Sequence, residues 1–121
     1  MALKARALSK NRWASARKVR RVADLVRGMT VGQALNTLHF SSSAASTPVE
    51  KTVRSAMANL LESENTGRLL EDDVVISEIQ VNEGPTYKRL RARAMGRAFR
   101  IRKRTCHITV EVSANIREDM E

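Results

Sequence analysis

The reactive side chains of this sequence are few, and one pair is adjacent. Cys106 is followed by His107, and a cysteine beside a histidine is the usual pairing of a thiol nucleophile with its base. The surrounding residues alternate between apolar and polar, which is typical of a strand, and neighbours on a strand point to opposite faces. The pattern therefore favours a packed cysteine and a histidine at the surface over a catalytic pair.

Candidate metal ligands are equally sparse. The acidic residues 71–73 (EDD) adjoin one another in a turn, and no other carboxylate group has the spacing of a metal site. The single Cys106, with only His39 and His107, cannot form a cysteine-based zinc site. The five glycines are scattered and form no phosphate-cradling loop. We therefore expect no catalytic residue, no metal, no cofactor and no enzymatic activity.

The basic residues carry a stronger signal. The chain has 121 residues and a net charge of +9, and a domain this basic usually meets a polyanion, most often nucleic acid and next an anionic membrane surface. Residues 1–28 and 85–104 together hold eighteen of the 22 Lys and Arg but only one of the 13 acidic residues. A solvated surface usually mixes both signs, so the segregation favours two phosphate-binding segments on an acidic globule.

Residues 85–104 are rich in arginine, whose guanidinium group forks onto phosphate and stacks on bases. Small residues alternate with the basic ones near the middle of this segment, so a narrow tip is expected that can pass between RNA helices. Opposed like charges destabilise a strand pair by roughly 0.2–1 kcal/mol, and a two-stranded ribbon is marginal in water. The segment therefore gains nothing from folding alone and is explained by phosphates that neutralise it.

Three helices are expected to support these segments. Ser15 begins the first, which runs to Arg27 with Gly28 as its stop, and Thr30 and Gln33 have capping-box spacing for a second, short helix. Apolar residues at helical spacing define the inner faces, namely Val19, Val22, Ala23 and Val26 in the first helix and Val31, Ala34, Leu35 and Leu38 in the second. The outer side of the first helix carries Arg17, Lys18, Arg20 and Arg21.

The third helix has a clear predicted start. Thr47 is expected to cap it, Pro48 to take its first position and Glu50 to complete a capping box, and it should end near residues 65–67. Its apolar side consists of Val49, Val53, Ala56, Met57, Leu60 and Leu61.

Strands are expected where the apolar period becomes two. Residues 2–9 predict a short strand with one basic face, and residues 74–83 and 100–113 predict two longer strands. In the last strand, Cys106, Ile108, Val110 and Val112 should point one way and Thr105, His107, Thr109 and Glu111 the other. The sequence predicts one α+β domain over residues 1–121, with residues 80–104 as an extended basic β-hairpin.

Residues 83–112 (EGPTYKRLRARAMGRAFRIRKRTCHITVEV) resemble the signature of the large-subunit ribosomal protein L22 family, bacterial type. The specific parts are Lys88, the run 93–97 (RAMGR) and the run 107–112 (HITVEV) at the family's spacing. The opening half is similar to the family too, in SARKVRRVADLVRG, QALNTL and KTVRSAMANLLE. The similarity covers nearly the whole chain in the family's order, with departures at Tyr87, Arg91, Ala92 and Cys106.

The resemblance implies a fold and a place in the cell. The fold would be three helices packed on a small antiparallel sheet, with a long protruding β-hairpin. The globular part would sit near the peptide tunnel exit of a cytoplasmic ribosome, and the hairpin would line the tunnel. The partners implied are large-subunit ribosomal RNA, neighbouring ribosomal proteins and, transiently, the nascent peptide, with no membrane. The tunnel-facing tip would comprise Lys88, Arg89, Leu90, Arg91, Ala92, Arg93 and Ala94.

The basic side chains expected to contact ribosomal RNA lie in both segments. They are Lys10, Arg12, Arg17, Lys18, Arg20, Arg21, Lys88, Arg89, Arg93, Arg97, Arg100, Arg102, Lys103 and Arg104. Trp13 lies among them, and either stacks on a base or packs as a hydrophobic staple onto the first helix. Two other functions stay open from sequence, a free-standing RNA or DNA module and an RNA-modifying enzyme. The start MALKARALSK has no signal-peptide core and no apolar run is long enough for a span, so we expect a soluble, intracellular protein.

Overall fold

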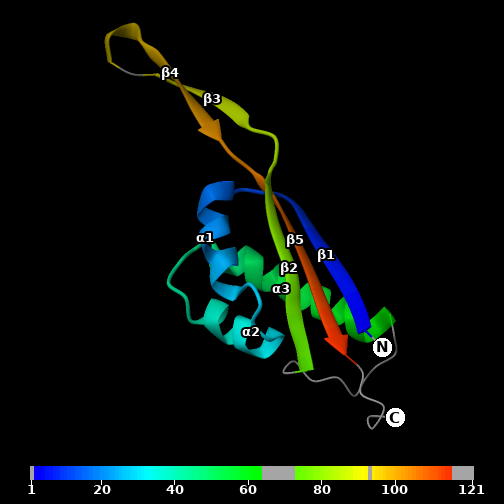
Figure 1. Cartoon of the computed structure of the whole chain (residues 1–121). Helices are drawn as coiled ribbons and strands as arrows, with labels where there is room; N and C mark the ends of the chain where they lie inside the picture. Colours follow the sequence, from blue (N-terminus) through cyan, green and yellow to red (C-terminus); the bar gives the residue numbers. More distant parts are fainter. Residues whose placement is uncertain (1, 64–72, 93, 116–121) are drawn as a thin grey trace.

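The computed structural model describes residues 2–63, 73–92 and 94–115, and it has an α+β fold (Figure 1). The helices are α1 (Ala16–Val26), α2 (Val31–His39) and α3 (Ser46–Ser63). The strands are β1 (Ala2–Arg12), β2 (Val74–Glu83), β3 (Tyr87–Ala92), β4 (Ala98–Lys103) and β5 (Cys106–Asn115). The expected fold class, three helices on a small antiparallel sheet with a protruding hairpin, is confirmed.

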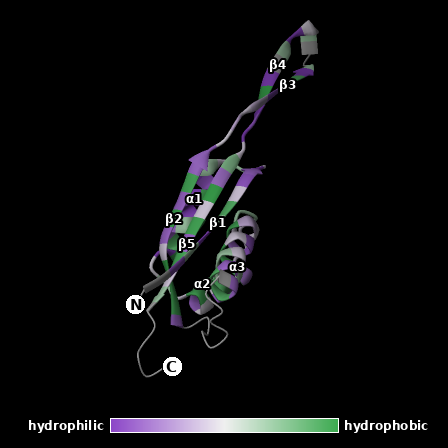
Figure 2. Cartoon of the chain, turned by 90° about the vertical axis from the view of Figure 1, so that its right-hand side faces the viewer, coloured by the Kyte–Doolittle hydropathy of each residue, from purple (hydrophilic) through white to green (hydrophobic). Residues whose placement is uncertain are grey.

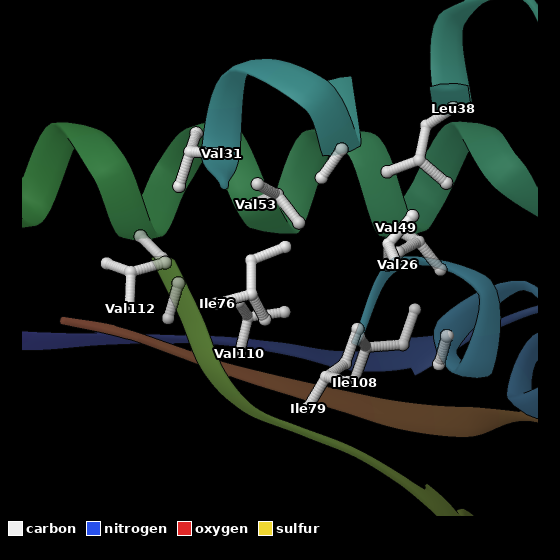
Figure 3. Packing of buried hydrophobic residues seen from close by; sticks show 14 of the residues in the cluster. Val26, Val31, Leu38, Val49, Val53, Ile76, Ile79, Ile108, Val110 and Val112 are labelled. Atoms are coloured by element: carbon white, nitrogen blue, oxygen red, sulfur yellow. The ribbon is translucent and has the colours of Figure 1, made fainter. Parts of the chain in front are cut away.

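The main sheet has three antiparallel strands in the order β1-β5-β2, so the last strand of the chain lies at its centre. The helices cover one face of this sheet, and aliphatic side chains fill the space between them (Figure 3). Val53 on α3 and Val110 on β5 are both completely buried. The core is built from small branched residues, and their dense packing makes the globular part a rigid base for the rest of the chain.

The predicted helix faces are confirmed. Every residue assigned to the inner faces of α1 and α2 is buried, and α3 buries all of its predicted apolar side except Leu61, which packs against the core while partly exposed. Gly28 follows α1 with a φ of +82°, a conformation that suits glycine. The Thr30 hydroxyl accepts a hydrogen bond from the Gln33 backbone N–H at 3.3 Å. Ser15 holds the N-cap position of α1, but its side chain makes no capping hydrogen bond.

The start of α3 differs from the expectation. The helix begins at Ser46, so Thr47 lies inside it and is not its cap. Ser46 is buried and its hydroxyl donates to the Ser43 carbonyl at 2.7 Å, which fixes the entry into the helix. The Glu50 carboxylate pairs with Arg54 at 3.0 Å and with His39 at 3.5 Å instead of closing a capping box. The predicted end at residues 65–67 lies outside the described residues.

Both edges of the main sheet are covered for part of their length. At the β2 edge, the Ile76 N–H donates to the Met29 carbonyl at 3.0 Å, and Thr30 forms a bridge with Val75. At the β1 edge, the Asn59 side-chain amide on α3 donates to the Arg6 carbonyl at 2.9 Å. The backbone groups of these edge strands are therefore partly used inside the molecule.

The hairpin strands β3 and β4 pair with each other and project away from the globular part (Figure 1). The prediction of a single strand over residues 100–113 is wrong, because Arg104 and Thr105 interrupt the strand and separate β4 from β5. Thr105, expected on the outer face, is buried. Its hydroxyl donates to the Pro85 carbonyl at 2.6 Å, and its own carbonyl accepts from the Gly84 N–H at 3.0 Å. These two bonds form the junction from which the hairpin leaves the sheet.

Candidate nucleic-acid interface

The hairpin turns between Ala92 and Ala98. Its register pairs Lys88 with Arg102 near the globular part and Ala92 with Ala98 at the far end. The turn contains a short 3₁₀ segment, Ala94–Gly96, in which Met95 has a φ of +66° and is 94% exposed. The turn thus begins after residue 92, whereas residues 88–94 were expected at or near the tip.

The residues assigned to that tip occupy different heights on the hairpin. Lys88 and Arg89 lie in the half of β3 next to the globular part, and Leu90 and Arg91 follow them toward the turn. Ala92 ends β3 and Ala94 begins the 3₁₀ segment inside the turn, whereas Arg93 lies outside the described residues.

The two faces of the hairpin differ in composition. Residues with the alternate spacing of a strand share a face, so one face carries Lys88 and Leu90 on β3 opposite Arg102 and Arg100 on β4. The other carries Tyr87, Arg89 and Arg91, with Lys103 and Ile101 opposite Tyr87 and Arg89. The side chains of β3 are all exposed. Hydrophilic colour covers much of the projecting hairpin in Figure 2.

The hairpin cations find no acidic partner within residues 2–63, 73–92 and 94–115. The ion pairs between residues of that part of the chain involve Lys4 and Arg6 of β1, Arg27 directly after α1, His39 of α2 and Arg54 of α3. Lys88 and Arg102 instead face each other directly across the ribbon. Like charges in such a pair oppose strand pairing, so the hairpin holds positive charge that its own described fold does not neutralise.

A basic groove lies between α1 and the base of the hairpin, and we call it the hairpin-base groove. It has a volume of about 670 Å³. Its cationic lining comes from three parts of the chain, namely Arg17 and Arg20 of α1, Lys88 of β3, and Arg102 and Arg104 on the return strand and its end. Among the described residues, Glu83 is the one acid that lines it. The fold thus joins the two basic segments, which are separated by 56 residues in the sequence.

Arg20 lines this groove and also makes a structural hydrogen bond. Its Nε–H donates to the Val81 carbonyl at 3.0 Å and so ties α1 to β2. Arg27, directly after α1, makes a similar bond to the same strand: one of its η nitrogens donates to the Ile79 carbonyl at 2.8 Å. The prediction for Arg20 assigned it to RNA alone and missed this structural bond.

A second groove lies where β1 ends and α1 and α3 begin, and we call it the N-terminal groove. It has a volume of about 780 Å³. Of the residues that the structure describes, four cations line it, namely Lys10 and Arg12 of β1, Lys18 of α1 and Lys51 of α3, and no acid does. Lys51 was missed by sequence reasoning because it lies in the net-acidic part of the chain. Only the packing of α3 beside β1 brings it to this site.

Trp13 does not form a hydrophobic staple. It is 65% exposed, and its ring stacks on Tyr87 of the hairpin with a centroid distance of 5.4 Å and an interplanar angle of 30°. Trp13 lines the N-terminal groove and also a smaller hollow beside Arg102, Lys103 and Arg104. The two aromatic residues therefore connect the globular part with the base of the hairpin.

The remaining predicted side chains are exposed but line neither of the two grooves. They are Arg21 on α1 and Arg89, Arg97, Arg100 and Lys103 in the hairpin region. Together with the grooves they extend the basic surface along the hairpin.

Cys106 and His107 do not form a catalytic pair. Cys106 is completely buried, and this burial raises the pKa of its thiol, which disfavours the reactive thiolate. His107 lies on the opposite face, where its Nδ1 accepts the Asn11 backbone N–H at 3.1 Å. In the described ranges, no three histidine, cysteine or acidic side chains gather as metal ligands. No helix there has the length and apolar character to span a membrane.

Comparison with known proteins places the chain. The family model described as ribosomal protein L22p/L17e matches residues 7–113. The chain belongs to this family. It is also 48% identical over 111 residues to the large ribosomal subunit protein uL22 of Halothermothrix orenii (strain H 168), which covers 92% of this chain and 96% of that relative. The family match runs from β1 through the hairpin into β5, so both grooves lie within the part that defines the L22p/L17e family.

Proposed function

We propose that this chain is a structural constituent of the large ribosomal subunit and binds ribosomal RNA through its two basic segments. Family membership and the name of the similar uL22 protein support the placement in the subunit. The observation that carries RNA binding is the hairpin, whose cations find no carboxylate partner within the described residues and face one another across the ribbon. A polyanion supplies the missing neutralisation.

The chemistry of the interface favours recognition of RNA shape. Arginine and lysine heads bind phosphate and sugar and carry little sequence information. The hairpin-base groove aligns cations of α1 with cations of β3 and β4, which suits an RNA backbone that passes across the base of the hairpin. We assign no catalytic role, because Cys106 is buried and points away from His107.

The location on the ribosome follows from the family resemblance. The hairpin would pass between RNA helices and line the peptide exit tunnel, where the turn around Met95 would meet the nascent peptide. The globular part would contact neighbouring ribosomal proteins near the tunnel exit of a cytoplasmic ribosome. The projection of the hairpin beyond the globular part supports this arrangement (Figure 1).

Sedimentation of a tagged copy on a sucrose gradient tests the placement. The wild-type chain should travel with the large subunit in about one copy and crosslink to RNA through residues 85–104. The double variant Arg93→Ala, Arg97→Ala should be depleted from the subunit while its helical circular dichroism is retained. Arg54→Ala removes a cation that pairs with Glu50 on α3, and it should sediment as wild type. A wild-type chain that stays at the top of the gradient in low salt would favour a free-standing nucleic-acid module.

Salt dependence tests the phosphate contacts. An interface with 6–10 phosphate contacts loses about 10³–10⁵ in affinity between 50 and 200 mM salt. We expect filter binding of the free protein to ribosomal RNA fragments to show a loss of this order. A flat titration would contradict the proposal, because it would mean that the cations do not bind phosphate.

A further inference from the structure

The indole of Trp13 has one covered face and one open face. Tyr87 stacks on it at a centroid distance of 5.4 Å, and yet 65% of the residue is exposed. A ring that is covered on one side and still this exposed presents its other side to solvent. Trp13 is also part of the wall of the N-terminal groove. The open aromatic surface therefore borders a hollow and not a flat surface.

The rest of that groove is cationic. Lys10, Lys18 and Lys51 come from β1, α1 and α3, and Arg12 precedes the tryptophan directly. The Arg12 Nε–H donates to the Ser9 hydroxyl, which holds this guanidinium against β1. No carboxylate from the described part of the chain lines the groove. The site thus combines an aromatic face with positive charge, which are the two features with which proteins hold single-stranded nucleic acid.

We propose that Trp13 is a stacking platform for one unpaired base of an RNA single strand, whose flanking phosphates lie along Lys10, Lys18 and Lys51. This site rests on the proposed function, since it takes RNA as the partner, and it adds a contact of a different kind. Bases in a continuous duplex are already stacked on each other, so the ligand is a loop, a bulge or a strand end. Tyr87 covers the other face of the indole.

Fluorescence reports on this site directly, because Trp13 is the only tryptophan in the chain. The full-length protein would be titrated in low salt with a short oligoadenylate and, separately, with an abasic oligonucleotide of the same length. Both probes carry the same phosphates, but only the first carries bases. We expect oligoadenylate to quench the indole emission and to bind more tightly, and the abasic strand to bind without quenching.

Substitutions separate a stacking platform from a structural brace. Base–aromatic stacking is worth about 1–3 kcal/mol, so Trp13→Ala should weaken binding of labelled oligoadenylate by about 5- to 150-fold, down to the affinity of the abasic strand. Trp13→Phe should restore part of the loss. Tyr87→Ala should keep most of the affinity, because it leaves the indole in place. Phe40→Ala removes an aromatic side chain that is 82% exposed but lines neither groove, and it should bind as wild type.

Three results would overturn the platform. They are equal quenching by both probes, a Trp13→Ala variant with wild-type affinity, and an equal loss for Tyr87→Ala and Trp13→Ala, which would reduce Trp13 to a brace for the hairpin. Each leaves the proposed function intact as long as binding to ribosomal RNA stays steeply salt-dependent. Failure of the protein both to bind ribosomal RNA and to sediment with the subunit would remove both proposals together.

Discussion

Glu111 shows how a single side chain holds the outer face of the sheet. It lies on the central strand β5, where its carboxylate accepts a hydrogen bond from Arg6 at 2.9 Å and has the Lys4 ammonium at 3.8 Å. The hydrogen bond from Arg6, followed by the charges of Arg6 and Lys4 against some desolvation, holds the pKa of Glu111 below its usual value. The same bond raises the pKa of the Arg6 guanidinium. Both shifts favour the charged forms in the folded protein.

The lowered pKa of Glu111 predicts a stability change in acid. Its contribution is complete above the ordinary glutamate pKa of about 4.3 and is lost as the pH falls through the lower folded value. Glu111→Gln should therefore lower the unfolding free energy at pH 7 and flatten its decline below pH 4.3. Urea unfolding across this range measures the effect. Glu62→Gln, an exposed glutamate on α3, should keep the wild-type slope, and an unchanged slope in Glu111→Gln would contradict the assignment.

A side chain at position 84 would clash with its neighbours at the hairpin junction. A Cβ at this position would lie 2.6 Å from the Thr105 hydroxyl and 3.3 Å from the His107 ring. The hydroxyl is held by its bond to the Pro85 carbonyl and cannot retreat freely. Gly84→Ala should destabilise the fold by about 1–3 kcal/mol, the usual cost of overpacking. Chemical denaturation would measure this.

A double-mutant cycle tests the cause of that loss. In a Thr105→Ala background the clashing oxygen is gone, so Gly84→Ala should cost clearly less than in the wild-type chain. Additive losses would show that Thr105 is not the atom that the new methyl group meets.

At the scale of the element, the hairpin has a charge arrangement that opposes its own pairing and that the proposed RNA binding would neutralise. Lys88 and Arg102 form a directly opposed like-charged pair. Lys88→Gln should leave the unfolding free energy of the free protein unchanged or raise it by up to about 1 kcal/mol. The same change should weaken RNA binding and lower the slope of log affinity against log salt by about one. Thermal unfolding and a salt titration of the same sample check both halves, and a loss of stability without a change in slope would contradict them.

The elements were predictable where one face of a regular structure is buried. The spacing of Val19, Val22 and Val26 is readable from sequence because a helix repeats every 3.6 residues, and the alternation from Cys106 to Val112 because a strand repeats every two. β2 was predicted with its observed bounds for the same reason. The extra residue at the bulge near Ser77 does not disturb that pattern enough to hide the strand.

The junction and the grooves depend on tertiary contacts that sequence does not display. The break at Arg104 is hidden because the alternation continues on both sides of it, and Thr105 is buried only because Pro85 and Gly84 meet it from another strand. Lys51 joins the N-terminal groove through the packing of α3. The stack of Trp13 on Tyr87 joins residues that are far apart in sequence, which no local pattern reveals.

At the scale of the whole molecule, the protein has one part that folds on its own core and one that does not. The buried cluster joins the three helices to β1, β2 and β5, whereas β3 is exposed along its whole length. In the free protein, amides of β3 and β4 should exchange with solvent much faster than those of β5. Incorporation into the subunit should slow exchange in the hairpin selectively. Hydrogen exchange measured in both states checks this, and equally slow exchange of the two sheets in the free protein would contradict it.

The covered edges of the three-stranded sheet bear on the life of the protein before assembly. An open edge strand is a template on which another copy adds a strand, and such addition leads to aggregates. Here the bonds from Ile76 to Met29 and from Asn59 to Arg6 occupy edge carbonyls and amides inside one chain. The positive excess of the chain adds mutual repulsion between copies. Both features oppose the addition of strands between newly made copies of the chain.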